Sequence, residues 1–123
     1  HSKLSYADNK TEIIALNNLV KTICGREIKL FAPPSGAYSK TTTQVCKDIN
    51  MQVIMWSKDT IDWRDKDESL VISRATKDIK AGDMILMHPT AHTLKALPQI
   101  LDAYESAGLK TVSVSTIIGL TII

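Results

Sequence analysis

The sequence has few cysteines, no excess of charge of one sign and no long basic run. Among its 123 residues are two cysteines, Cys24 and Cys46, and no Cys-x-x-Cys pair, which excludes zinc-finger and thioredoxin-type motifs. Their spacing leaves open whether they form a disulfide or remain free thiols. The 15 Lys and Arg residues are nearly balanced by 13 Asp and Glu residues, so we expect no nucleic-acid partner.

The sequence also lacks a segment long and apolar enough for a transmembrane helix or a signal peptide. The apolar stretch of residues 117–123 is too short to span a bilayer. The chain begins at His1 without an initiator methionine, so we expect a processed or cut polypeptide, and the missing signal says little about localisation. A content of 44% hydrophobic and 23% charged residues is typical of a folded globular domain.

Helical and extended patterns alternate along the chain. Helices are predicted by apolar spacing and cap residues over residues 5–24, 39–49, 67–79 and 97–107, the last starting near Leu97 because Pro98 fits only the first turn of a helix. The predicted inner face of this last helix carries Leu94, Leu97, Leu101 and Tyr104. Strands are predicted over residues 29–31, 53–56, 84–87 and 111–114, the last followed by a short helical turn.

The predicted fold class is α/β, with parallel strands that alternate with helices and are joined by right-handed crossovers. Four strands are too few to close a barrel, and an open four-stranded sheet would leave two unprotected edges. Either something else covers those edges, such as another copy of the chain, or the chain is half of a larger sheet. The second interpretation is favoured.

Polar residues gather after the strands. Ser35 follows the first predicted strand, Asp59, Asp62 and Trp63 follow the second, and His88 ends the third. Since the carboxyl ends of parallel strands meet at one rim, where the active sites of (β/α) folds form, these residues are candidates for a functional site.

His88 is the strongest single candidate, because an imidazole can give or take a proton near neutral pH. A nearby carboxylate such as Asp62 would hold the ring and favour its protonated form. A plain alternative stays open: His88 could bond a loop carbonyl, and Asp59 and Asp62 could be ordinary turn and cap residues.

Two further patterns are weaker. Trp63 lies between Asp62 and Arg64 in a polar loop, where an aromatic face would suit a sugar ring, although it could also be core. His92 follows His88 by four residues, but Pro89 makes a shared helix unfavourable, so we expect no metal site from His1, His88 and His92.

Three segments resemble motifs of the polysaccharide deacetylase family, the NodB-homology carbohydrate esterases. They are residues 31–38 (Phe-Ala-Pro-Pro-Ser-Gly-Ala-Tyr), 59–63 (Asp-Thr-Ile-Asp-Trp) and 86–88 (Leu-Met-His), in the family's order and at its separations. The resemblance extends from Ser2 to about Ile118 and is similar to the C-terminal part of the domain, especially in a secreted, sporulation-type branch. It implies that residues 1–123 are the C-terminal half of one distorted (β/α) barrel domain, with the N-terminal part absent.

The resemblance also implies roles for individual residues. His88 would be the general acid that protonates the leaving amine, with Asp62 tuning it. The backbone N–H of Ser35 would be an oxyanion donor, Leu86 would line the acetyl pocket and Trp63 would form a wall of the groove. Pro34 and Asp59 belong to the same substrate-binding motifs.

The family's cofactor and substrate follow from the same resemblance. Members use a divalent metal, usually zinc, and its ligands would lie outside this chain, in motifs that the chain does not contain. The implied activity is hydrolysis of acetyl groups from N-acetylated sugars of peptidoglycan or a chitin-like polymer, in an extracellular or cell-wall location. Without the metal-binding motifs, we expect the chain alone to be inactive.

Two positions depart from the family pattern. Ala32 replaces the usual arginine that steadies the catalytic base, and Ser35 replaces the usual aromatic residue. These departures keep a second hypothesis open, in which the domain is catalytically inactive and binds saccharide or is structural. A third, in which an unrelated α/β module carries its acidic residues as caps, stays open as well.

Overall fold

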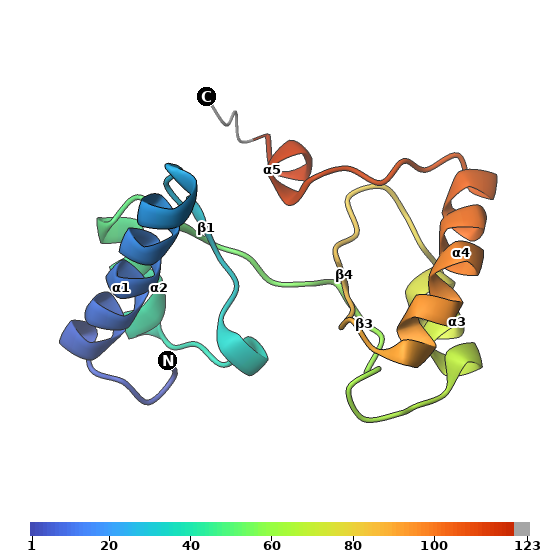
Figure 1. The fold of residues 1–123 in the computed structure, drawn as a ribbon, viewed down its shortest axis with the longest axis horizontal. Coiled ribbons are helices and arrows are strands. Elements are labelled where there is room, and N and C mark those ends of the chain that lie inside the picture. Colours follow the sequence, from blue (N-terminus) through green and yellow to red (C-terminus); the bar gives the residue numbers. More distant parts are fainter. Residues whose placement is uncertain (120–123) are drawn as a thin grey trace. The chain divides into compact units, whose positions relative to one another are not determined.

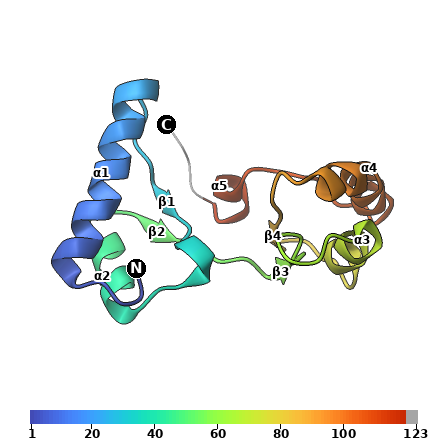
Figure 2. The same ribbon diagram turned by 60° about the horizontal axis from the view of Figure 1, so that its bottom comes forward.

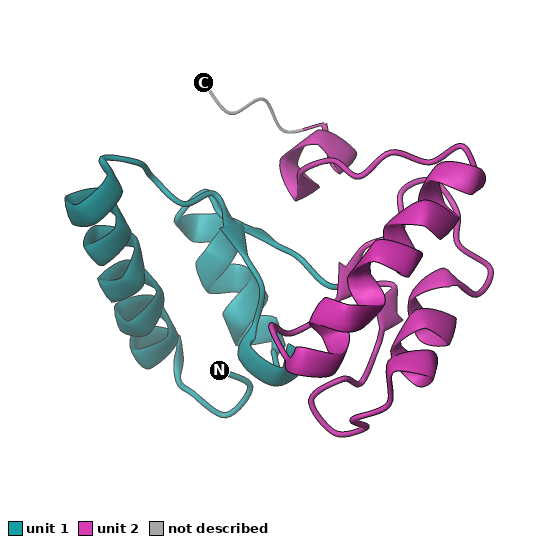
Figure 3. Ribbon diagram, turned by 45° about the vertical axis from the view of Figure 1, so that its right-hand side comes forward, with its two compact units in different colours: residues 1–55 teal, residues 56–123 magenta. Residues whose placement is uncertain are grey.

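The computed structural model of the chain describes residues 1–119, and its helices and strands fall into two units. The first unit is His1–Met55 and the second is Trp56–Ile123 (Figure 3). The predicted α/β pattern of alternating helices and parallel strands is confirmed in both units. The apolar tail predicted over residues 117–123 lies mostly outside the described residues.

The first unit contains two helices, two short strands and one turn of 3-10 helix. These are α1 (Tyr6–Cys24), β1 (Leu30–Phe31), η1 (Pro34–Gly36), α2 (Lys40–Asp48) and β2 (Gln52–Val53). The predicted caps explain the helix ends, since the Ser5 hydroxyl accepts a hydrogen bond from the N–H of Asp8 and Gly25 takes the left-handed conformation that stops α1. Ser39 and Thr42 form a capping box that starts α2.

The core of the first unit lies where α1 and α2 pack against the parallel pair β1–β2 (Figure 2). Its buried apolar residues are Ile13, Phe31, Val45, Cys46 and Met51. Cys46 belongs to this core whereas Cys24 is exposed, and both are free thiols, which resolves the question that their spacing left open. Burial raises the pKa of the Cys46 thiol, so it behaves as a small hydrophobic residue.

In the described part of the second unit, residues 56–119, there are two parallel strands and three helices, with α3 and α4 side by side (Figure 1). These are β3 (Lys58–Asp59), α3 (Glu68–Thr76), β4 (Ile85–Leu86), α4 (Ala91–Ser106) and α5 (Val114–Ile117). Asp67 caps α3 as predicted. The core between α3 and α4 consists of Val71, Ala75, Ala96, Ile100 and Tyr104.

The second predicted strand, residues 53–56, is wrong in its extent. The chain forms two short strands here, because its backbone changes partner along this stretch. The N–H of Ile54 still donates to the carbonyl of Phe31, the last residue of β1, and the N–H of Ser57 donates to the carbonyl of Met84, just before β4. Asp59, predicted to lie in the loop, is therefore the last residue of β3.

The fourth predicted strand, residues 111–114, is also wrong. No strand pairs with this segment among the residues that the structure describes, and its exposed backbone at residues 111–113 is open to water. Ser113 instead caps α5 by accepting a hydrogen bond from the N–H of Thr116. The local capping preference decides the structure where a neighbouring strand is missing.

The start of α4 differs from the prediction by six residues. The helix begins at Ala91, not near Leu97, because the Thr90 hydroxyl caps it by accepting from the N–H of Thr93. Pro98 therefore lies inside the helix, where its ring removes one backbone hydrogen bond. Pro98 and Leu94, whose carbonyl loses that bond, are both exposed, so water can satisfy the carbonyl.

The leucines of α4 do not form its buried face. Leu94 and Leu101 are exposed, whereas Ala96 and Ile100 are fully buried. The small side chains of Ala75 and Ala96 let α3 and α4 approach closely, and the buried face of α4 also includes Tyr104, as predicted. The apolar spacing over residues 5–24 that predicts α1 includes Ile13, Leu16 and Ile23, but of these only Ile13 is buried.

Because Ile100 is buried and Leu94 is exposed, truncating these two residues of α4 is expected to affect stability to very different degrees. Ile100→Ala is expected to lower the free energy of unfolding by about 2–5 kcal/mol, because Ile100 is completely buried and its removal leaves a cavity. Leu94→Ala, at a side chain that is 71% exposed, is expected to change it by no more than about 0.5 kcal/mol. Urea unfolding of both variants checks this, and equal losses would place the leucine face inside.

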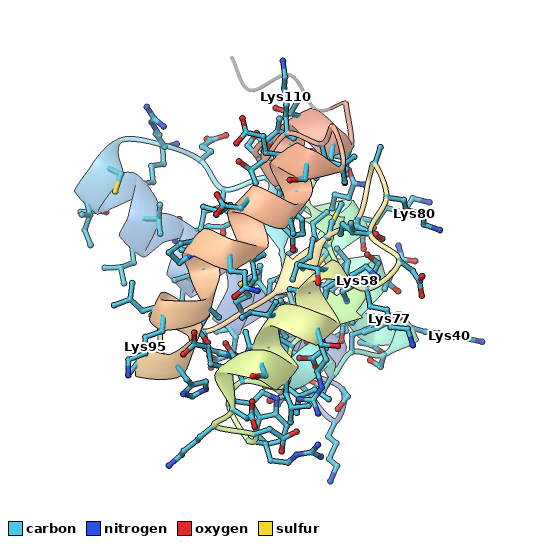
Figure 4. The ribbon with its side chains drawn as sticks, turned by 90° about the vertical axis from the view of Figure 1, so that its right-hand side faces the viewer. Lys40, Lys58, Lys77, Lys80, Lys95 and Lys110 are labelled. Atoms are coloured by element: carbon cyan, nitrogen blue, oxygen red, sulfur yellow. The ribbon has the colours of Figure 1, made fainter. Side chains whose placement is uncertain are left out.

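Within the described residues, no helix has the length and hydropathy that crossing a membrane requires. The lysines of the second unit are spread over its surface: Lys95 and Lys110 lie apart from Lys58, Lys77 and Lys80 (Figure 4). The ammonium of Lys58 is itself engaged, since its Nζ donates to the carbonyl of Lys77 at 2.6 Å. That no nucleic acid binds stays a prediction.

Candidate active site

The loop after β3 is a tight turn that brings Asp62 into the protein. The Asp59 carboxylate accepts a hydrogen bond from the N–H of Ile61 at 2.8 Å, which closes an Asx-type turn. The Thr60 hydroxyl, fully buried, donates to the carbonyl of Leu86 at 2.9 Å and ties the loop to β4. Ile61 has a φ of 53°, a strained conformation for a β-branched residue that the surrounding bonds must hold.

The carboxylate of Asp62 is buried and accepts three hydrogen bonds. Its Oδ1 accepts from the ring Nδ1 of His88 at 2.7 Å. Its Oδ2 accepts from the backbone N–H of His88 and from the Thr93 hydroxyl, each at 2.6 Å. The contact between Asp62 and His88 that the sequence predicted is therefore present, and it joins the ends of two paired strands.

The ionised form of Asp62 is favoured despite its burial. Desolvation by burial opposes the charge and raises the pKa, but the hydrogen bonds from the His88 N–H, the Thr93 hydroxyl and the His88 ring outweigh it and lower the pKa below its ordinary value. An ionised carboxylate at this position can only accept hydrogen bonds.

The orientation of the His88 ring follows from that carboxylate. Because Asp62 accepts, the Nδ1 of His88 must carry a hydrogen, which leaves Nε2 as the free end of the ring. The side chain of His88 is 43% exposed although its partner is completely buried. Asp62 thus holds one end of the imidazole inside the protein, and the other end is available for proton transfer.

An apolar pocket lies beside His88 at the start of α4. It is lined by Met87, His88, Pro89, Thr90, Ala91, Thr93, Leu94 and Leu97. Leu86, predicted to line an acetyl pocket, is not among these residues; it pairs in register with Asp59 in the β3–β4 ladder. The role of Leu86 stays a prediction.

Trp63 lies at the surface of the same loop. Its side chain is 60% exposed, and the guanidinium carbon of Arg64 lies 6.0 Å from its ring centroid. Asp65 anchors the loop through Arg64 and through Arg74 of α3, whose Nη2 lies 2.7 Å from the carboxylate. These two guanidinium groups hold the pKa of Asp65 well below its usual range. An exposed indole on an anchored loop is suited to stacking against a flat ligand.

Pro34 and Ser35 belong to the first unit, whereas the other predicted site residues belong to the second. Both lie in η1 and are exposed. Ser35 has a φ of 56° and is followed by Gly36 at 66°, so two successive residues take the left-handed conformation in this turn. Their proposed contacts with a substrate stay predictions.

Each of the three histidines has a polar partner of its own. The Nδ1 of His1 contacts the Oδ1 of Asn9 at 2.8 Å, His88 is bound to Asp62, and the Nε2 of His92 donates to the carbonyl of Asp62 at 2.7 Å. Among residues 1–119, no three His, Cys, Asp or Glu side chains are close enough together to hold a metal ion. The described residues therefore do not fit the family's metal.

Two polar residues of this site were not found from the sequence. Thr93 and His92 both contact Asp62, through its carboxylate and through its carbonyl. The cap motif Thr90-x-x-Thr93 was the available signal, because a threonine three residues after a cap residue points back to the start of the helix. Because the helix was predicted to start near Leu97, Thr90 and Thr93 were placed before it and did not indicate a cap.

Comparison with known proteins identifies the family. The family model described as polysaccharide deacetylase matches residues 1–54. The chain is 33% identical over 107 residues to the uncharacterised protein YlxY of Bacillus subtilis, covering 87% of this chain and 34% of that protein. It is 28% identical over 99 residues to a peptidoglycan-N-acetylglucosamine deacetylase of Bacillus cereus, covering 76% of this chain and 46% of that protein.

A solved structure supports the same conclusion. The crystal structure of a CE4 family pseudoenzyme from Bacillus anthracis matches with a TM-score of 0.90 at 27% identity, covering 96% of this chain and 42% of that one. The chain thus spans between about a third and a half of the length of these proteins. It has the α/β fold of a partial barrel, and the resemblance to the polysaccharide deacetylase family of NodB-homology carbohydrate esterases is confirmed.

Proposed function

We propose that the protein is a metal-dependent deacetylase of N-acetylated sugars in a cell-wall polysaccharide, and that this chain supplies the general-acid side of its site. The observation that supports this most directly is the pair formed by His88 and Asp62, in which a buried carboxylate fixes Nδ1 and leaves Nε2 free. The family of the chain supports deacetylation of a polysaccharide.

Hydrolysis of an N-acetyl group needs a proton for the departing nitrogen, because an amide anion is a very poor leaving group. A protonated His88 would give that proton from Nε2, while Asp62 compensates the positive charge of the ring. After the transfer, the neutral ring keeps its hydrogen on Nδ1, where Asp62 still accepts it. The same contact therefore serves both protonation states of the acid.

The remaining predicted residues are proposed to bind the substrate. Trp63 would stack on a sugar ring, which its exposed indole allows. Pro34 would shape the turn in which the backbone N–H of Ser35 acts as an oxyanion donor. Asp59 and Leu86 would contribute to the acetyl-binding side of the site.

The family's divalent metal, zinc in most members, activates a water molecule and polarises the acetyl carbonyl when it is bound. Because the described residues do not fit a metal site, we propose that its ligands lie outside this chain. The coverage of the relatives agrees with an N-terminal part of the domain that lies beyond the chain. That part, or another copy of the chain, would cover open strand edges and exposed apolar faces such as the one that carries Leu94 and Leu101.

The location and branch are proposed from the same family. A protein that acts on peptidoglycan must reach the cell wall, so we infer an extracellular or cell-wall location. The sporulation-type branch stays a prediction. The acetylated polysaccharide is then the main partner.

A second candidate function is an inactive deacetylase-like domain that binds saccharide or is structural. Two observations favour it: Ala32 and Ser35 depart from the family pattern, and the structure matched with a TM-score of 0.90 is that of a pseudoenzyme. In that case the Trp63 loop would retain a sugar-binding role without turnover. An experiment must therefore measure binding as well as hydrolysis.

The experiment compares acetate release and saccharide binding by the full-length natural protein, using N-acetylglucosamine oligomers with added zinc. Release of acetate that stops when a chelator is added is expected, and the 123-residue chain alone is expected to release none. Binding without release would support the inactive alternative. Neither binding nor release would contradict both.

A further inference from the structure

The Oδ2 atom of Asp62 is held by a short series of hydroxyl groups from the first turn of α4. The Thr93 hydroxyl lies 2.6 Å from this oxygen, and the Thr90 hydroxyl lies 2.8 Å from that of Thr93. Thr90 is the cap residue of the helix and also accepts a hydrogen bond from the N–H of Thr93. The series therefore begins at the cap of α4 and ends on the partner of His88.

The direction of every bond in this series is determined by the carboxylate. Since Asp62 can only accept, the Thr93 hydroxyl must donate to it. The oxygen of Thr93 is then an acceptor for the hydroxyl of Thr90. The Nε2 of His92 donates its hydrogen to the carbonyl of Asp62 at 2.7 Å and lies 3.0 Å from the oxygen of Thr90. The two threonine hydroxyls therefore donate in sequence toward the carboxylate of Asp62.

Thr93 occupies a rigid position. It is buried and shares the inner face of α4 with Ala96 and Ile100, which are packed against α3. Its hydroxyl is therefore delivered to Asp62 at a fixed place. The other two donors to the carboxylate, the backbone N–H and the ring Nδ1 of His88, both belong to the residue that is to be oriented, so Thr93 is the donor that holds the carboxylate independently of His88.

We infer that Thr93 is a positioning residue for His88: it fixes the plane of the Asp62 carboxylate, so that Oδ1 points at the ring Nδ1. The hydroxyl of Thr93 is hydrogen-bonded to Asp62 and not to the ring, so it acts through Asp62. The catalytic consequence rests on the proposed function, whereas the orientation of the ring does not.

The test uses Thr93→Val, which has nearly the same shape but no hydroxyl, and Thr93→Ser, which keeps the hydroxyl, in the full-length protein. The ¹⁵N-histidine NMR signal of the His88 Nδ1–H is expected to be sheltered from exchange in the natural protein and in Thr93→Ser, and to broaden or vanish in Thr93→Val. The kcat of Thr93→Val is expected to fall by about 10–100-fold with little change in KM, because the acid loses its alignment while the sugar-binding residues stay in place.

A sheltered Nδ1–H signal in Thr93→Val would overturn the inference. Loss of the signal in Thr93→Ser would also overturn it, because it would assign the effect to packing and not to the hydroxyl. If Thr93→Val fails to fold, Thr93→Ala compared with Thr93→Ser makes the same comparison without an added methyl group. A hydroxyl-dependent signal in a protein that releases no acetate would keep the positioning role and reject the proposed function. The two failures are therefore distinguishable.

Discussion

Replacing His88 by alanine is expected to lower kcat for deacetylation by about 10²–10⁴-fold in the full-length protein, the range that a positioned general acid contributes. The reason is geometric: Asp62 orients the ring so that Nε2 is the atom left for proton transfer. Substrate affinity should change much less than kcat, because the acid acts on the leaving group during the reaction. Initial rates on N-acetylglucosamine oligomers measure both quantities.

Lys95→Ala is a suitable control for this measurement. Lys95 lies on α4, close in sequence to the site, and its side chain is exposed (Figure 4). Its kcat should equal that of the natural protein. If His88→Ala retained full kcat while the enzyme remained folded, His88 would not be the acid, and the inactive or non-catalytic interpretation of the site would gain support.

The part of this site that could be predicted depended on strand ends. Asp62 and His88 follow two parallel strands, and the carboxyl ends of neighbouring parallel strands lie at one edge, so their contact could be predicted without coordinates. Helix caps were predictable for a similar reason, since Ser5, Ser39 and Asp67 act through bonds to residues three positions later. Local chemistry was enough in these cases.

The face of α4 could not be predicted in the same way. Hydrophobic size favours a stripe of leucines, but close contact with α3 selects Ala96 and Ile100. A difference of one or two positions rotates a helix by a large angle, and this rotation is what brings Thr93 to Asp62. Because the packing partner decides the face, the threonine contacts follow from tertiary structure and not from the pattern of the segment itself.

Asp62→Asn is expected to reduce kcat by about 10³–10⁴-fold while leaving the protein folded, the effect of a wrong histidine tautomer in a comparable Asp–His pair. The asparagine side chain must place its NH₂ group at the position of either Oδ1 or Oδ2 of Asp62. At the Oδ2 position the NH₂ would face two other donors, the N–H of His88 and the Thr93 hydroxyl, so it is better placed at the Oδ1 position, beside the ring. There it donates to Nδ1, and the hydrogen of the neutral ring moves to Nε2.

The tautomer can be measured directly. The ¹⁵N shifts of His88 are expected to show a hydrogen on Nδ1 in the natural protein and on Nε2 in Asp62→Asn. Thr60→Ser is a matched control, since it keeps the hydroxyl that ties the loop to Leu86 and leaves Asp62 unchanged. An unchanged tautomer with reduced kcat would show that Asp62 contributes through its charge alone.

The same substitution predicts how stability depends on pH. The pKa of Asp62 is lowered from its ordinary value of 3.8, so its ionised form stabilises the folded state fully above that pH, and this contribution is lost as the pH falls through the lower folded value. Asparagine cannot titrate, and at neutral pH its imperfect hydrogen bonds should cost about 1–3 kcal/mol. The difference in unfolding free energy between the two proteins should therefore shrink between pH 6 and pH 2.5, as measured in urea. A difference that stayed constant over this range would mean that Asp62 is not ionised through the hydrogen bonds of His88 and Thr93, which would remove the basis for the orientation of the ring.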